Sequence, residues 1–238
     1  MLRQARPGVR GSSDNTITGK NIAIIGDSYS TYYGWIPDGY SSWYAADGVD
    51  GHNTAENDVN SVEQTWWKQM INEKGYNLLV NSSYSGSCVC NTTFGGGDGT
   101  ATSFITRAAK DLEGKNPDTI YIFGGTNDSG AGCPVGSLKY SDWTTDDLKQ
   151  VLPAVCYLID WNKTNFPNAE IVWITNGFVG TYGEMYISQE IRDGIASACT
   201  HYGVKNILVE GKEGTECTNI HPNQTGMVKI KDTIVADM

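Results

Sequence analysis

The chain has 238 residues, which fits one domain with a core large enough to be stable without cross-links. Its formal net charge of −10 and isoelectric point near 4.7 argue against nucleic acid or an anionic membrane surface as a partner. No stretch reaches the roughly 20 apolar residues that a membrane span needs, so we expect no membrane partner.

The first residues differ in composition from the rest of the chain. Residues 1–19 are polar, contain three arginines and lack the apolar centre of a secretory signal. They predict a disordered lead or an artificial extension, followed by a single domain over residues 20–238. Because a signal peptide is removed from a mature chain, its absence is compatible with a secreted protein.

Short apolar runs rich in Ile, Val and Tyr recur along the chain. They are nearly continuous rather than alternating, which is typical of strands covered on both faces. The predicted strands cover residues 21–25, 76–80, 119–123, 170–175 and 205–209. Helical periodicity follows over residues 62–74, 187–202 and 223–236. A further helix runs from a cap at Thr144 or Thr145 to Ile159, and Pro153 predicts a kink or a restart within it.

Strands that alternate with helices predict an α/β fold. We expect a three-layer sandwich in which a five-stranded parallel sheet, in flavodoxin-like order, carries helices on both faces. A long polar and aromatic loop near residues 31–60 lies outside this minimal pattern. Loops of that length are usually functional or disordered.

Polar or small residues stand just behind three of the predicted strands. Ser28 follows the first strand, Gly86 the second and Asn127 the third, whereas His221 precedes the last helix. The carboxyl ends of parallel strands meet at one edge of a sheet, so we expect Ser28, Gly86 and Asn127 to lie together. A hydroxyl, an amide donor and an imidazole are the groups that serine-type ester cleavage requires.

The sequence around these residues contains motifs in a fixed order. They are Gly26-Asp27-Ser28-Tyr29-Ser30, Gly86, Gly125-Thr126-Asn127-Asp128 and His221-Pro222. Together they resemble the first, second, third and fifth blocks of the SGNH (GDSL-type) hydrolases. The resemblance implies that Ser28 attacks an ester carbonyl and that His221 takes its proton. It also implies an oxyanion hole formed by the backbone N–H groups of Ser28 and Gly86 and the Asn127 amide, with no metal and no cofactor.

The chain departs from the family pattern beside the base. The pattern is D-x-x-H, whereas the residue three positions before His221 is Thr218. Threonine cannot supply a negative charge to an imidazolium. Three explanations stay open. In the first, a main-chain carbonyl near Thr218 orients the imidazole and leaves a Ser–His dyad. In the second, the Glu216 carboxylate reaches the imidazole. In the third, a carboxylate comes from elsewhere in the chain, or the protein is catalytically impaired.

Aromatic residues are dense in the loop behind the nucleophile. Tyr29, Tyr32 and Trp35 predict a platform that stacks on a sugar face or an acyl group. We therefore expect an acetylesterase that removes O-acetyl groups from carbohydrate, with a small-molecule or polysaccharide ester as its partner. Two alternatives stay open: a broad-range lipolytic esterase or thioesterase, and a non-catalytic carbohydrate-binding protein on the same scaffold.

Six cysteines are many for a cytosolic protein of this length, and an even number permits complete pairing. They favour disulfides and a secreted or extracytoplasmic location. Cys133 and Cys217 are the expected pair, because both lie in loops that the motifs place around one site. Cys88 and Cys90 have C-x-C spacing in a chain with three histidines, which argues against a structural zinc site.

Overall fold

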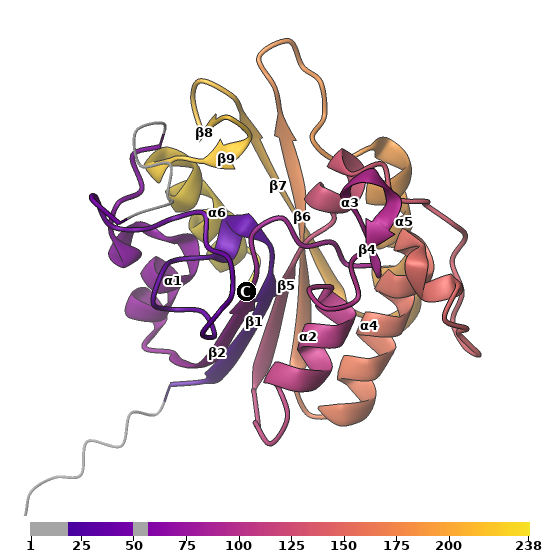
Figure 1. Ribbon diagram of the computed structural model, residues 1–238. Helices are drawn as coiled ribbons and strands as arrows, with labels where there is room; N and C mark the ends of the chain where they lie inside the picture. The colour runs from indigo at the N-terminus through magenta and orange to yellow at the C-terminus, as the bar shows by residue number, and fades with distance from the viewer. Residues whose placement is uncertain (1–18, 50–56) are drawn as a thin grey trace, which may run out of the picture.

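A central sheet of five parallel strands runs through the protein, which the computed structural model describes over residues 19–49 and 57–238 (Figure 1). The strand order is β2-β1-β5-β6-β7, and every neighbouring pair is parallel. The predicted α/β class, the five strands and their flavodoxin-like order are confirmed. The strands are β1 (Asn21–Gly26), β2 (Asn77–Ser83), β5 (Thr119–Phe123), β6 (Glu170–Val179) and β7 (Lys205–Lys212).

Helices cover both faces of this sheet and complete the three layers. One face carries α1 (Trp66–Lys74) and α6 (Gln224–Ala236), and the other carries α2 (Phe104–Asp111), α4 (Val151–Asn165) and α5 (Gln189–Tyr202) (Figure 1). The sequence patterns missed α2 and also α3 (Thr126–Gly130), because eight and five residues are too few to show a clear period. Among the described helices, none is long and apolar enough to cross a membrane.

Several shorter elements connect these layers. Two hairpins of two-residue strands stand apart from the main sheet, and 3-10 turns precede some of the helices. The short strands are β3 (Thr92–Thr93), β4 (Gly97–Asp98), β8 (Cys217–Thr218) and β9 (His221–Pro222). The 3-10 turns are η1 (Ser28–Ser30), η2 (Val62–Gln64), η3 (Phe94–Gly96) and η4 (Asp147–Lys149).

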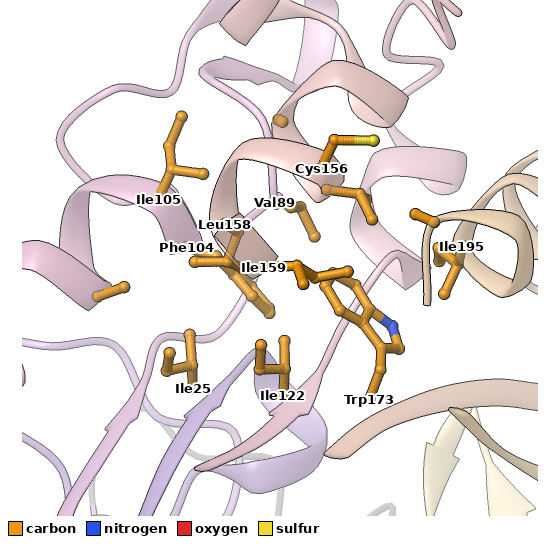
Figure 2. Close-up of a cluster of buried hydrophobic side chains, with 14 of the residues drawn as sticks. Ile25, Val89, Phe104, Ile105, Ile122, Cys156, Leu158, Ile159, Trp173 and Ile195 are labelled. Carbon is orange, nitrogen blue, oxygen red and sulfur yellow. The ribbon is translucent and has the colours of Figure 1, made fainter. Parts of the chain in front are cut away.

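The central strands bury side chains on both faces, which explains their continuous apolar runs. On β1, Ile25 belongs to the core under α2, α4 and α5, whereas Ile24 belongs to the core under α1 and α6. Figure 2 shows Ile25 and Ile122 of the sheet together with Phe104 of α2 and Ile159 of α4. Each such buried side chain contributes about 1.5–3 kcal/mol to stability. Two covered faces therefore fix the position of the sheet.

Helix α4 begins later than the expected cap at Thr144 or Thr145. The 3-10 turn η4 comes first, the chain is extended at Gln150, and the helix starts at Val151. Pro153 consequently lies in the first turn of α4, where backbone N–H groups have no acceptor within the helix, so the missing N–H of proline costs nothing. The predicted restart is confirmed, and no kink is needed.

The cysteines of the chain are all free and buried. Cys133 belongs to the core cluster under α2, α4 and α5, whereas Cys217 belongs to the cluster under α1 and α6. Because the sheet separates these clusters, the expected Cys133–Cys217 pairing is wrong. Cys133 lies instead beside Cys88, with 3.8 Å between the two sulfur atoms.

The long loop expected near residues 31–60 is described up to residue 49 and from residue 57 onward, and the lead at residues 1–18 lies outside the described residues. The loop folds back on itself where the Tyr33 N–H donates to the Tyr44 carbonyl at 2.9 Å. The Tyr44 hydroxyl then donates to the Pro222 carbonyl at 2.8 Å. These contacts bring the loop to the part of the chain that carries the predicted base.

Candidate active site

Ser28 stands in a sharp turn directly behind β1. Asp27 caps the 3-10 turn, and its carboxylate accepts the Tyr29 N–H at 3.0 Å. A Cβ on Gly26 would lie 2.8 Å from side-chain atoms of Ser30 and Ser83, so a glycine lets the strand end pass this closely to its neighbours. The turn leaves Ser28 at the carboxyl edge of the sheet.

Gly86 and Asn127 follow the two strands that flank β1. In the order β2-β1-β5, both neighbours run parallel to β1 and end level with Gly26. Gly86 has a φ of 80°, a conformation that glycine adopts without strain. The topology thus brings Ser28, Gly86 and Asn127 to one edge of the sheet, where the sequence analysis expected them.

The start of α3 ties the Gly86 loop to the fold. The Asn127 amide donates to the Ser87 carbonyl at 3.0 Å. The buried Asp128 carboxylate accepts the Val89 N–H at 2.9 Å. Burial raises the pKa of Asp128, and the backbone donors act in the opposite direction. Asp128 therefore has a structural role, since it holds the loop against the helix that carries Asn127.

Potential metal ligands lie below this loop. In the described part of the chain, Cys88, Asp128 and Cys133 offer atoms that all lie within 4.8 Å of one another. Both Asp128 oxygens already accept backbone N–H groups from Val89 and Cys90. The carboxylate is thus engaged in holding the loop, and its position follows from these hydrogen bonds.

A buried guanidinium joins the strand ends to the same loop. Arg107 of α2 donates to the Gly26 carbonyl at 2.9 Å, to the Ser87 hydroxyl at 3.0 Å and to the Ser82 carbonyl. Burial lowers the pKa of Arg107 to about 10, which leaves it charged at neutral pH. The sequence gives no signal for this residue, because one arginine in a short helix forms no motif.

His221 reaches the nucleophile from the far end of the chain. Its Nε2 lies 2.9 Å from the Ser28 Oγ, and its Nδ1 lies 2.9 Å from the Asn219 carbonyl oxygen. A carbonyl only accepts, so Nδ1 carries the proton and Nε2 accepts the Ser28 hydroxyl. His221 is 7% exposed, and burial lowers its pKa to about 4. The imidazole is therefore neutral at neutral pH, as a general base must be.

A tight hairpin creates the contact between imidazole and carbonyl. Thr218 of β8 pairs with His221 of β9 in antiparallel register. The two connecting residues, Asn219 and Ile220, have φ values of 48° and 62°, as in the two-residue turns that fit a twisted hairpin. Thr218 contributes backbone pairing, and the carbonyl that meets the imidazole belongs to the next residue, Asn219.

Glu216, the other residue considered as an orienter of the imidazole, is engaged elsewhere. Its carboxylate pairs with the Lys229 ammonium at 3.2 Å and accepts the Lys212 N–H at 2.9 Å. These contacts hold the side chain against α6 and the end of β7. The structure therefore does not bring the Glu216 carboxylate to His221.

The tyrosines expected to bind substrate are part of the core, which corrects that expectation. Tyr29 is buried and its hydroxyl donates to the Ile220 carbonyl. Tyr32 is also buried and donates to the Asn60 carbonyl at 2.9 Å. Neither ring has a free face for substrate. Trp35 is 42% exposed and packs beside Trp67 of α1, with 5.8 Å between ring centroids.

Two asparagines that the sequence analysis did not select brace the site. The Asn57 amide donates to the Pro222 carbonyl at 3.1 Å. The buried Asn176 of β6 donates to the Tyr29 hydroxyl at 3.2 Å and to the Thr126 hydroxyl at 3.1 Å. An asparagine at the end of an apolar strand is a signal that pattern reading can detect. Asn57, in a polar loop, gives no such signal.

Trp43 is a further residue that the sequence did not single out. Its indole lies flat against the His221 ring, with 3.5 Å between centroids and 8° between planes. Nothing in the sequence distinguishes Trp43 from its many aromatic neighbours. The contact arises because the loop returns to the chain end.

Comparison with known proteins finds similarity over almost the whole chain. A family model described as GDSL-like Lipase/Acylhydrolase matches residues 20–238. A GDSL-like lipase-family crystal structure from Bacteroides uniformis is 41% identical, with a TM-score of 0.81 and coverage of 92% of this chain and 95% of that one. A second, from Bacteroides ovatus, is 37% identical, with a TM-score of 0.81 and coverage of 93% and 98%. The comparison with curated proteins gives no match.

A more distant similarity concerns the fold alone. A family two carbohydrate esterase from Clostridium thermocellum, solved in complex with cellohexaose, is 17% identical, with a TM-score of 0.58. The alignment covers 92% of this chain and 63% of that one. The sheet and helices described above are therefore common to both proteins.

Proposed function

The chain belongs to the GDSL-like lipase/acylhydrolase family, and on this premise we propose that it hydrolyses carboxylic esters with a Ser28–His221 dyad. The observation that carries the proposal is the 2.9 Å contact between the His221 Nε2 and the Ser28 Oγ. The neutral, buried imidazole supports the same assignment, because it is ready to accept a proton.

Acylation begins when the Ser28 Oγ attacks the ester carbonyl and its proton moves to the His221 Nε2. The tetrahedral intermediate then collapses, and the same proton passes to the leaving alcohol. Water enters next, gives its proton to Nε2 and attacks the acyl-enzyme. The acid leaves, and Ser28 regains its proton from His221.

The oxyanion is assigned to three donors at the edge of the sheet. These are the backbone N–H groups of Ser28 and Gly86 and the side-chain amide of Asn127. Loss of one such side-chain donor typically costs about 2.7–4 kcal/mol of transition-state stabilisation. The contacts of Ser87 with Asn127 and of Val89 with Asp128 support this assignment, because they fix the Gly86 loop relative to α3.

The Asn219 carbonyl replaces the usual carboxylate as the orienter of the imidazole. It holds the proton on Nδ1, and hence the tautomer, without bringing a charge. In a Ser-His-Asp triad, neutralising the aspartate lowers turnover about 10⁴-fold because the imidazole takes the wrong tautomer. A carbonyl acceptor avoids that error, so the dyad keeps much of the catalytic power of a triad.

The substrate class that we propose is an O-acetylated carbohydrate. Trp35, just behind the nucleophile turn, is 42% exposed, and its indole offers an aromatic surface on which a sugar can stack. The fold shared with family two carbohydrate esterases favours the same class. A long acyl chain would need an apolar groove, and the polar loops around the site are poorly suited to form one.

The test measures acetate release from acetylated xylan and hydrolysis of p-nitrophenyl esters of increasing acyl length. We expect activity on acetyl groups and a decline with chain length. Ser28→Ala and His221→Ala should abolish turnover and, for Ser28→Ala, labelling by a fluorophosphonate. Glu216→Gln should change turnover little. A preference for long acyl chains would reject the substrate class, and an unlabelled wild-type Ser28 would reject the esterase itself.

A further inference from the structure

One face of the catalytic imidazole is covered by the indole of Trp43. The two rings are stacked, with 3.5 Å between centroids and 8° between planes. Tyr29 and Tyr44 approach the same imidazole edge-on, at centroid distances of 5.6 and 6.4 Å. Of these three aromatic neighbours, Trp43 is the one that presents its π face to His221.

Hydrogen bonds fix Trp43 to both halves of the dyad. The backbone N–H of Trp43 donates to the Thr31 hydroxyl at 2.9 Å, and this hydroxyl donates to the Ser28 carbonyl at 2.9 Å. The next residue, Tyr44, donates its hydroxyl to the Pro222 carbonyl beside His221 at 2.8 Å. The backbone that carries the indole is therefore fixed relative to the nucleophile turn and to the strand that carries the base.

The stack matters most when the imidazole becomes charged. The Ser28 proton converts His221 to an imidazolium, and the Asn219 carbonyl is a neutral partner for it. The face of an indole attracts a cation within about 6 Å of the ring centroid, and tryptophan does this best among the aromatic residues. A neutral imidazole is attracted to the indole face much less strongly. The attraction therefore grows as the transition state forms, which is the condition for faster chemistry.

Other groups around the ring do not supply this charge stabilisation. Ser28 faces Nε2, and the Tyr29 and Tyr44 phenols have pKa values raised well above their ordinary range by burial, so both stay neutral. Within residues 19–49 and 57–238, no charged side chain contributes to the pKa of His221. The Asn57 amide donates to the backbone carbonyls of His221 and Pro222 rather than to the ring.

We propose that Trp43 is a positioning residue of the dyad, whose π face holds the His221 ring toward Ser28 and stabilises its imidazolium in place of a carboxylate. The inference rests on the proposed esterase function for its catalytic consequence. The stack itself concerns the electrostatics of His221, so part of the test is independent of turnover.

The decisive experiment keeps the shape of Trp43 and weakens its π face. Tryptophan analogues with one to four ring fluorines are inserted at position 43 alone, and the pKa of His221 is followed by NMR in histidine-labelled protein. We expect the pKa to fall with each added fluorine. We also expect kcat/KM for p-nitrophenyl acetate at pH 8 to fall in step, by about tenfold for the tetrafluoro analogue.

The matched control inserts the same analogues at Trp161. This tryptophan of α4 packs edge-on against Phe166, with 5.9 Å between ring centroids, and belongs to the layer under α2, α4 and α5. The analogues at Trp161 should leave the His221 pKa and kcat/KM unchanged. Equal effects at both positions would mean a general loss of packing and would overturn the proposal.

Substitutions by natural amino acids give a second test, in which the direction of the shift in the acid limb of kcat/KM distinguishes the two explanations. Trp43→Phe retains a weaker π face and should lose less activity than Trp43→Leu. In Trp43→Leu, loss of the attraction should move the acid limb of kcat/KM to lower pH while the plateau falls. An acid limb that moves up toward pH 6.5 with an unchanged plateau would mean that the indole only excludes water, and the proposal would be rejected.

The two proposals fail in different ways. Wild-type protein that neither hydrolyses esters nor reacts with a fluorophosphonate would reject the esterase, and the NMR titration would still decide the role of the stack. An active enzyme whose His221 pKa is constant across the fluorinated series would retain its proposed function and lose this inference.

Discussion

His221 combines a neutral resting state with a fixed tautomer, and both follow from its immediate surroundings. Burial disfavours the imidazolium, and the Asn219 carbonyl holds the proton on Nδ1. Nε2 is thus free to accept the Ser28 proton across a wide range of pH. A solvent-exposed imidazole would lose this readiness near pH 6.5.

This environment predicts how kcat/KM depends on pH on the acid side. Because the pKa of His221 is lowered to about 4 by burial, kcat/KM for p-nitrophenyl acetate should stay constant down to about pH 5 and then fall. The unfolded chain takes up the proton first, so stability also declines from about pH 6.5 to pH 4. Circular dichroism at each pH separates unfolding from titration. A midpoint near 6.5 in folded protein would contradict the prediction.

Asp27 predicts an effect of pH on stability. Burial raises its pKa to about 7, one oxygen accepts the Tyr29 N–H, and the other has no partner in the described structure. The folded state therefore holds this proton more tightly than the unfolded one, and stability falls as pH rises from about 4 through 7. Asp27→Asn retains an acceptor for Tyr29 and removes the buried charge. Urea denaturation should show a larger stability gain at pH 8 than at pH 5; equal changes at both would contradict this.

Among the elements, the loop behind β2 depends on partners from two helices. Arg107 of α2 donates to the Ser87 hydroxyl, and Asp128 of α3 accepts the Val89 N–H. The chain between β2 and α2 has no long regular element of its own, so these buried polar groups decide the position of Gly86. Arg107 also joins the ends of β1 and β2, because it donates to the carbonyls of Gly26 and Ser82.

Replacement of Asp128 should loosen this loop. Asp128→Ala leaves the Val89 and Cys90 N–H groups buried without an acceptor, at a cost of about 1–3 kcal/mol each. We expect a lower melting temperature, faster hydrogen exchange in residues 84–90 and a lower kcat. Asp128→Asn retains one oxygen and should fall between this variant and the wild type. Unchanged exchange in the loop of Asp128→Ala would show that other contacts position it.

On the scale of the whole molecule, the two covered faces of the sheet provide stability without cross-links. Both core clusters contain fully buried aromatic and aliphatic side chains, and the cysteines are distributed between them as small apolar residues. The contact with Cys88 and, to a smaller extent, burial raise the pKa of the Cys133 thiol. Such thiols react slowly, because the thiolate is the reactive form.

The state of the cysteines is open to a direct measurement. We expect almost none of the cysteine thiols to react with a thiol reagent in the native protein. In denatured protein that has not been reduced, all six thiols should react. The melting temperature should not depend on reductant. Fewer than six thiols after denaturation without reductant would identify disulfides, and the closely spaced Cys88 and Cys133 would be the first pair to examine.

The amino-acid sequence determined the sheet and the residues that line its reactive edge. Strands buried on both faces must be apolar throughout, so their positions can be read directly, and parallel strands bring their carboxyl ends to one edge. The placement of Ser28, Gly86 and Asn127 at that edge follows from these two facts, and the match of a family model over residues 20–238 confirms the resemblance drawn from the motifs.

Tertiary structure decided what surrounds the imidazole. A hairpin of residues 217–222 turns the Asn219 carbonyl toward His221, Lys229 draws Glu216 away, and the returning loop lays Trp43 on the ring. Sequence spacing could not show which group orients the imidazole or which ring covers it, because each arrangement depends on contacts between segments that are far apart along the chain. Such contacts leave no periodic pattern, and they exist only once the two covered faces have fixed the sheet.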